Sequence, residues 1–175
     1  AFVERLLRLG RREEALRYAE EDVAWFGKDP RLLPLLDLLV AHRGGVEDHR
    51  ARFRLRPNLE DYLALKAKLG RTFAEERPRL LRQVQDSALL ARIHLLEEDW
   101  KALDRLLKRA SPEVYPALAA ALEERLPQEA ARLYLEAAKA RVEAGGRAAY
   151  REAAGLLGRL ARLDPKRARE AAWGL

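Results

Sequence analysis

Four arginines alternate with other residues in one short stretch, at Arg50, Arg52, Arg54 and Arg56. In an extended segment alternate side chains point to the same side, so the four guanidinium groups would form one row that contacts phosphates. In a helix the same four groups would be spread around the circumference. The run therefore predicts either a phosphate-contact site or the charged end of a helix that stops before Pro57.

A second group of basic residues lies near the C-terminal end of the sequence. Residues 139–175 hold nine Lys or Arg against four acids, which is an excess of +5 in a chain of net charge +6. We expect either a positive stripe with a low centre, where a phosphate backbone or an acidic helix approaches, or a solvated face whose glycines admit a neighbouring helix. The residues that would share this face of a helix over 147–163 are Arg147, Arg151, Gly155, Gly158 and Arg162.

Residues typical of catalytic or metal sites are few. The chain has no Cys, and its three histidines, His42, His49 and His94, do not have the spacing of a zinc-ligand set. Adjacent acids such as Glu13 and Glu14 diverge on a helix. The sequence contains no serine-triad order, phosphate loop or glycine-rich nucleotide turn. We therefore expect no enzymatic activity, no cofactor and no bound metal.

The composition indicates a helical protein. Ala, Leu, Arg and Glu dominate, whereas the β-branched residues are limited to one Ile, one Thr and seven Val. With 49% hydrophobic and 35% charged residues, the chain has enough apolar side chain to fold. Arg outnumbers Lys by 27 to 7, and Cys and Met are absent, a thermophile-like composition that a GC-rich genome also produces.

The sequence shows no signal peptide and no membrane span. Its first residues mix Glu4 and Arg5 with apolar ones, and the most apolar run, 32–41, contains Pro34 and Asp37. That run is far shorter than the about 20 residues that a membrane helix needs. We expect a cytoplasmic protein without membrane contact. Because no initiator Met is present, we also expect the chain to be a segment of a longer protein.

Helix signals recur along the whole chain. Asp29, Ser111 and Asp164 each precede a proline, which is the pattern of an N-cap followed by the first helical residue. Thr72 has the spacing of a capping box with its downstream Glu, and Asp86 is a further N-cap candidate. The apolar periodicity between these signals predicts helices near 2–9, 12–26, 30–43, 46–54, 57–69, 73–85, 87–97, 99–110, 112–125, 128–144, 147–163 and 165–173.

A short helical hairpin recurs in the sequence, at 6–16 and again at 93–103. Alternate predicted helices begin at intervals of roughly 25 to 35 residues, close to the tetratricopeptide period. We predict an all-α, tetratricopeptide-like stack of antiparallel helical hairpins, an α-solenoid, forming a single helical-repeat domain over residues 1–175. From their helical register, most of six aromatic residues should lie in its core: Trp25, Tyr62, Trp100, Tyr115, Tyr134 and Tyr150.

Four stretches carry a resemblance to a known family: 56–65, 93–103, 130–134 and 148–157. They resemble the helical region that follows the zinc finger in bacterial SWIM zinc-finger proteins, which is itself similar to tetratricopeptide repeats. The SWIM finger uses a Cys-x-Cys pair followed by Cys-x-His, and this chain has no Cys, so the finger itself is absent. The zinc, and the nucleic-acid or protein binding that the resemblance implies, would belong to an upstream segment of the parent protein.

These features favour a non-catalytic protein–protein interaction scaffold, in which a peptide or helix of a partner docks on one face of the stacked hairpins. The alternative is a nucleic-acid-binding accessory domain that uses the C-terminal basic surface. Arginines paired one by one with carboxylates across helices would argue against this alternative. Neither the identity of a protein partner nor the oligomeric state follows from the sequence.

Overall fold

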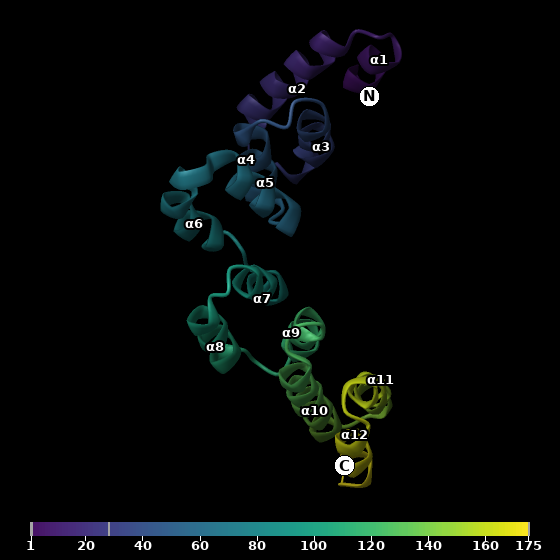
Figure 1. Cartoon of the computed structure of the whole chain (residues 1–175). Coiled ribbons are helices and arrows are strands. Elements are labelled where there is room, and N and C mark those ends of the chain that lie inside the picture. The colour runs from purple at the N-terminus through teal and green to yellow at the C-terminus, as the bar shows by residue number, and fades with distance from the viewer. Residues whose placement is uncertain (1, 28, 175) are drawn as a thin grey trace. The chain divides into compact units, whose positions relative to one another are not determined.

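The secondary structure of the described residues is entirely helical. The computed structural model describes residues 2–27 and 29–174, and within them it contains α-helices, two short 3-10 helices and no strand (Figure 1). The all-α class is therefore confirmed. The helices are α1 (Phe2–Arg8), α2 (Arg12–Phe26), η1 (Pro30–Leu32), α3 (Leu33–His42), α4 (Val46–Leu55), α5 (Leu59–Leu69), η2 (Gly70–Thr72), α6 (Phe73–Leu81), α7 (Ser87–Leu96), α8 (Trp100–Arg109), α9 (Tyr115–Leu122), α10 (Pro127–Ala144), α11 (Arg147–Leu163) and α12 (Pro165–Gly174).

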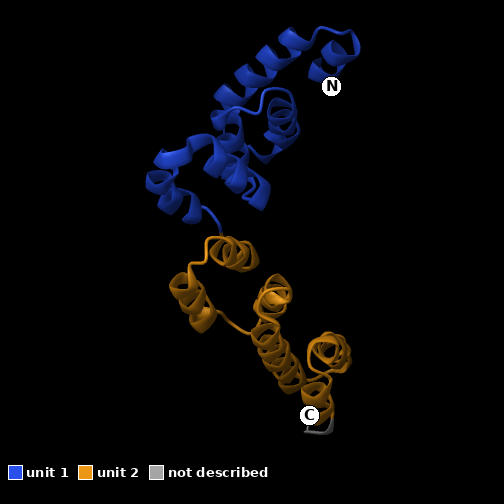
Figure 2. Ribbon diagram, in the orientation of Figure 1, with its two compact units in different colours: residues 1–84 blue, residues 85–175 orange. Residues whose placement is uncertain are grey.

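The chain divides into two compact units, Ala1–Val84 (unit 1) and Gln85–Leu175 (unit 2) (Figure 2). In unit 1 each of the helices α1 to α6 packs against the next one along the chain. In unit 2 α7 packs against both α8 and α9, and the remaining helices again pack in chain order from α9 to α12. Both units are thus built mainly from helices that pack against their neighbours in the chain, while the antiparallel hairpins, the single domain and the tetratricopeptide-like solenoid stay predictions.

Each unit has its own apolar core. In unit 1 the core near the N-terminus is built on Val3, Leu6 and Ala15, and the adjoining one on Leu36 and Leu39. The core of unit 2 runs from α7 to α12 and is rich in Ala and Leu, with buried Tyr134 among them. Small Ala side chains let neighbouring helices approach closely, and the burial of the Leu side chains supplies most of the stabilisation.

Prolines move two helix starts away from the predicted positions. The predicted helix 30–43 begins as the 3-10 helix η1, and α3 starts at Leu33 with Pro34 in its first turn. The predicted helix 112–125 likewise starts only at Tyr115, with Pro116 in its first turn, so Ser111 does not cap it. A proline inside a helix would remove a backbone hydrogen bond and clash with the carbonyl four residues earlier. Starting α3 and α9 one residue before Pro34 and Pro116 places each proline in the first turn and avoids that cost.

Three of the predicted caps are confirmed. The Asp29, Asp86 and Asp164 carboxylates accept hydrogen bonds from backbone N–H groups two or three residues later, at 2.9, 2.8 and 2.9 Å. The capping box at Thr72 is wrong, because its hydroxyl donates instead to the Leu69 carbonyl. The predicted helix over 73–85 also ends earlier, at the C-terminal residue of α6.

The recurring hairpin closes with the same turn in both places. After α1, the N–H groups of Gly10 and Arg11 donate to the carbonyls three and five residues earlier, and after α7 those of Glu98 and Asp99 do so. This is the hydrogen-bond pattern of a Schellman motif, whose turn residue has positive φ. Gly10 takes this conformation at 72° and Glu98 at 54°. The two turns therefore share a geometry although their residues differ.

The prediction that most of the six aromatic residues lie in the core is wrong. Tyr62 and Tyr134 are fully buried, but Trp25 is 85% exposed, Trp100 50% and Tyr150 54%. On α2 the core side chains are alanines at positions 15 and 19, and a residue at position 25 does not return to that helical face.

No helix within the described ranges combines the length and apolarity needed to cross a bilayer.

Candidate functional site

The four alternating arginines belong to a helix, so they are spread around it. Arg50, Arg52 and Arg54 lie within α4, and Arg56 is its C-cap. Arg50 donates to Glu47 in its own helix and, at 2.6 and 3.2 Å, to Glu76 of α6. Among the other three only Arg52 is buried, whereas Arg54 and Arg56 are exposed. The structure therefore does not bring the four guanidinium groups to one surface.

Arg52 is the centre of a buried ionic cluster that joins three helices. Its guanidinium donates to both carboxylate oxygens of Asp61 on α5, each at 2.8 Å. It also donates to Asp37 on α3 at 3.0 Å and to Glu60 at 2.9 Å. Arg56 adds a longer ion pair to Asp37 at 3.6 Å. The cluster therefore ties α3, α4 and α5 together.

Asp61 is fully buried, and its carboxylate has two further hydrogen-bond partners. We call this group of residues around Arg52 and Asp61 the Asp61 cluster. His49 Nδ1 lies 2.6 Å from one carboxylate oxygen, and the Asn58 side-chain amide donates to the other at 2.6 Å. Burial raises the pKa of the Asp61 carboxyl, but the hydrogen bonds from Arg52, His49 and Asn58 lower it by more. The pKa of Asp61 therefore lies below its usual range, and the carboxyl is ionised. A His–Asp contact can orient a general base, but here both oxygens hold helices together.

A second ionic group joins α2, α3 and α4. Arg43 follows α3 and donates at 2.8 Å to Asp48 on α4, which is 3% exposed, and it also donates to Glu20 on α2. The Asp48 carboxylate accepts a further hydrogen bond from the Gly45 N–H at 2.8 Å. Gly44 turns the chain between the two helices with φ of +58°, where an added Cβ would lie 3.1 Å from the Val40 carbonyl oxygen. The tight turn brings the Asp48 carboxylate within hydrogen-bonding distance of the Arg43 guanidinium.

The C-terminal basic face differs from the α4 arginines. Arg147, Arg151 and Arg162 on α11 are exposed, and no ion pair joins them to any acid in the described part of the chain. A Cβ added at Gly155 or Gly158 would meet no atom within 4 Å. The expectation that these glycines admit a neighbouring helix of this chain is therefore wrong. The face is open, positive and low at its centre.

A groove of about 480 Å³ lies in unit 1 between α1, α2 and α3. Figure 1 shows α1 and α3 on the same side of α2. The volume is within the roughly 300–1,000 Å³ typical of binding pockets. We call this the α1–α3 groove, and its walls are largely apolar: Phe2, Leu7, Tyr18, Pro34, Leu35 and Leu38.

The walls of the α1–α3 groove are held from behind by the core. Leu7, Tyr18, Leu35 and Leu38 are half-buried because they pack on the Val3–Leu6–Ala15 core. Phe2 meets Tyr18 edge to face, with ring centroids 5.0 Å apart, yet remains 57% exposed. The groove is thus a preformed apolar surface with one exposed aromatic wall.

The Asp61 cluster and the groove were both missed by reasoning from the sequence. In the cluster, the partners of Arg52 on α3 and α5 are 15 and 9 residues away, beyond any spacing within one helix. One signal was available: Asn58 is the only Asn in the chain and stands immediately before a helix, where it accepts the N–H of Asp61 at 2.8 Å.

Comparison of the chain with protein-family models, with curated proteins and with solved structures finds no match in any of the three. The resemblance to the helical region of SWIM zinc-finger proteins therefore stays a prediction. Within the described ranges no group of three or more Asp, Glu or His side chains is placed to hold a metal ion.

Proposed function

We propose that this chain is a non-catalytic scaffold that binds another protein, and that the α1–α3 groove is its binding surface. The observation that carries the proposal is the groove itself, an apolar hollow lined from three helices and left open in unit 1. Apolar grooves between helices take the apolar face of a partner helix or peptide. An exposed ring such as that of Phe2 is the kind of side chain that dominates binding energy at interfaces.

The ionic clusters support a scaffold rather than a reaction centre. The one His–Asp contact of a kind found in catalytic sites is that of His49 with Asp61, and the Asp61 carboxylate also accepts hydrogen bonds from Arg52 and Asn58. In such a pair the imidazole is the general base, which needs access to the proton that it abstracts, and His49 is only 6% exposed. The cluster fixes the positions of α3 and α5 instead.

Site-specific photo-crosslinking in cells tests the scaffold proposal. A benzophenone amino acid would replace Phe2 in the full-length protein, and Phe26, which is 63% exposed but outside the groove, would be the matched control. We expect discrete protein adducts from position 2 and none from position 26. Absence of any specific adduct from either position, together with turnover of a substrate by the purified protein, would contradict the proposal.

The open face of α11 supports a second candidate function, the binding of a nucleic acid. Its three exposed arginines have no carboxylate partners in the described residues, and guanidinium groups in that state are available to phosphates. The α4 arginines do not support this function, because Arg50 and Arg52 are held by acids of the same chain.

Charge reversal separates the two functions. A variant with Glu at Arg147, Arg151 and Arg162 would be compared with a control that reverses three exposed arginines of unit 1, at positions 54, 71 and 79. If α11 binds nucleic acid, its variant alone loses affinity, and the slope of log affinity against log salt falls by about 2 to 3 in magnitude. Equal affinities and slopes for the two variants would exclude this second function.

A further inference from the structure

The open face of α11 carries an exposed aromatic ring beside its arginines. Tyr150 is 54% exposed, and no ring contact or side-chain hydrogen bond joins it to another described residue. It follows Arg147 by three residues, and residues at that spacing are neighbours on a helix surface. The ring therefore lies at one margin of the positive face and is accessible to a ligand.

An apolar strip continues from this ring along α11. Ala154, Leu157 and Ala161 follow Tyr150 at intervals of four, three and four residues, which places all four on one side of the helix. The two alanines are exposed and Leu157 is half-buried. We call these four residues the apolar strip, and Arg147, Arg151 and Arg162 beside it the arginine strip.

The arginine strip has no acid within its own helix to neutralise it. The only acid of α11 is Glu152, and its carboxylate pairs with Arg141 of α10 at 2.9 Å. Arg147, Arg151 and Arg162 form no ion pair with any described residue. Their guanidinium groups are therefore available to an anionic ligand.

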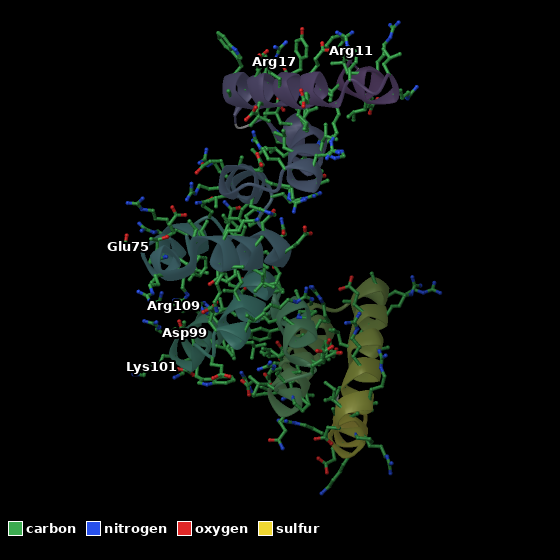
Figure 3. The ribbon with its side chains drawn as sticks, turned by 45° about the horizontal axis from the view of Figure 1, so that its top comes forward. Arg11, Arg17, Glu75, Asp99, Lys101 and Arg109 are labelled. Atoms are coloured by element: carbon green, nitrogen blue, oxygen red, sulfur yellow. The ribbon has the colours of Figure 1, made fainter. Side chains whose placement is uncertain are left out.

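The other basic helix of unit 2, α8, differs from α11 in this respect. Its Lys108 pairs with Asp104 at 2.7 Å. Figure 3 shows Asp99 at the same edge of unit 2 as Lys101 and Arg109 of α8. Acids thus accompany the cations of α8, whereas the cations of α11 are grouped without them. The attraction for a phosphate backbone should be stronger at α11.

From the two strips we infer that α11 binds single-stranded nucleic acid, with one base stacked on Tyr150 and phosphates on Arg147, Arg151 and Arg162. This inference rests on the second candidate function and names the form of nucleic acid. The base faces of a duplex are stacked on one another, so only a single strand can offer a base to an exposed ring while its phosphates reach the cations.

The length of the arginine strip sets the size of the site. Arg147 and Arg162 are fifteen residues apart, which is about 22 Å along the helix axis. A stacked strand rises about 3.4 Å per nucleotide, so the site holds at most about six nucleotides. A 12-nucleotide probe is therefore long enough to contact both ends of the strip.

Fluorescence anisotropy on the intact chain tests the inference with three labelled probes: a 12-nucleotide oligothymidine, a duplex of 12 base pairs, and an acidic amphipathic peptide. Tyr150→Ala should weaken binding of the oligothymidine at least about fivefold, because it removes the stacking surface. It should weaken binding of the duplex by less than about twofold, because the arginines that hold the phosphates are unchanged.

Two matched variants keep the test specific to stacking on α11. Tyr150→Phe keeps the ring and removes only the hydroxyl, so it should bind the oligothymidine within about twofold of wild type. Trp100→Ala removes a ring of similar exposure, 50%, from α8 of the same unit, and it should also stay within about twofold.

Three results would overturn the inference: an oligothymidine affinity unchanged by Tyr150→Ala, equal losses for single strand and duplex, or binding of the acidic peptide alone. The first two are distinguishable from failure of nucleic-acid binding itself. If reversal of the three arginines still abolished binding of both nucleic acids, α11 would bind phosphates without stacking, and only the single-strand assignment would be wrong. If wild type bound neither nucleic acid, the inference and the second candidate function would both be wrong.

Discussion

Asp61 is the residue on which the packing of unit 1 depends most. Its buried carboxylate meets Arg52, His49 and Asn58 at once, so its removal leaves buried polar groups without their acceptor. We expect Asp61→Ala to lower the free energy of unfolding by about 3–5 kcal/mol. The control is Asp104→Ala, which breaks an exposed pair with Lys108 and should cost about 0.5 kcal/mol. Chemical denaturation followed by circular dichroism measures both, and equal effects would refute the structural role.

The ionised state of Asp61 also predicts how stability depends on pH. Because its pKa in the folded protein lies below the value of about 3.9 expected in an unfolded chain, its contribution is complete above that value and is lost as pH falls through the folded pKa. The difference in unfolding free energy between wild type and Asp61→Asn should therefore shrink from pH 7 towards pH 3. A difference that stays constant over this range would contradict the assignment.

The Asp61 cluster shows the limit of residue-level reasoning from sequence. A carboxylate in the first turn of a helix, like that of Asp61, is common on protein surfaces because it complements the helix dipole. Its burial depends on α4, which packs against α5 and supplies Arg52 and His49, and the partners of Arg52 come from the helices on either side of α4. The alternation of the α4 arginines was visible in the sequence, but their carboxylate partners were not.

At the scale of elements, glycines inside a helix and a glycine in a tight turn should respond in opposite ways to replacement by alanine. Gly155 and Gly158 lie inside α11 with open space around them, so Gly→Ala at either should stabilise the protein by up to about 1 kcal/mol. Gly44→Ala should instead destabilise it by more than about 1 kcal/mol, because its φ is +58° and the added Cβ would press on the Val40 carbonyl. Thermal melts of the three variants measure this. Stabilisation by Gly44→Ala would contradict the turn geometry.

Helix positions could be predicted because their signals are local. Asp29, Asp86 and Asp164 cap as expected, since an N-cap needs only its own side chain and the next few N–H groups. The errors arose where two local signals competed. A second proline four residues after the first displaced the starts of α3 and α9. The groove could not be predicted, because its shape depends on how α1 and α3 pack against α2, and no local sequence signal specifies that packing.

At the scale of the whole molecule, the two compact units predict where a local defect spreads. Units with separate cores open separately in hydrogen exchange. We expect Asp61→Ala to accelerate amide exchange throughout α3, α4 and α5 of unit 1 and to leave the protected amides of α10 and α11 in unit 2 unchanged. Exchange followed by mass spectrometry measures this. Equal acceleration in both units would show instead that the chain unfolds as one cooperative domain.

The central claim is that the chain binds a partner protein through the α1–α3 groove. The most direct test measures how tightly the partner identified by photo-crosslinking binds to the purified wild type and to two variants. Wild type, Phe2→Ala and Phe26→Ala would be compared in one titration, because they differ only in which exposed ring is removed. We predict a loss of at least about tenfold, or about 1.4 kcal/mol, for Phe2→Ala and less than about twofold for Phe26→Ala. Equal affinities for wild type and Phe2→Ala would contradict the claim.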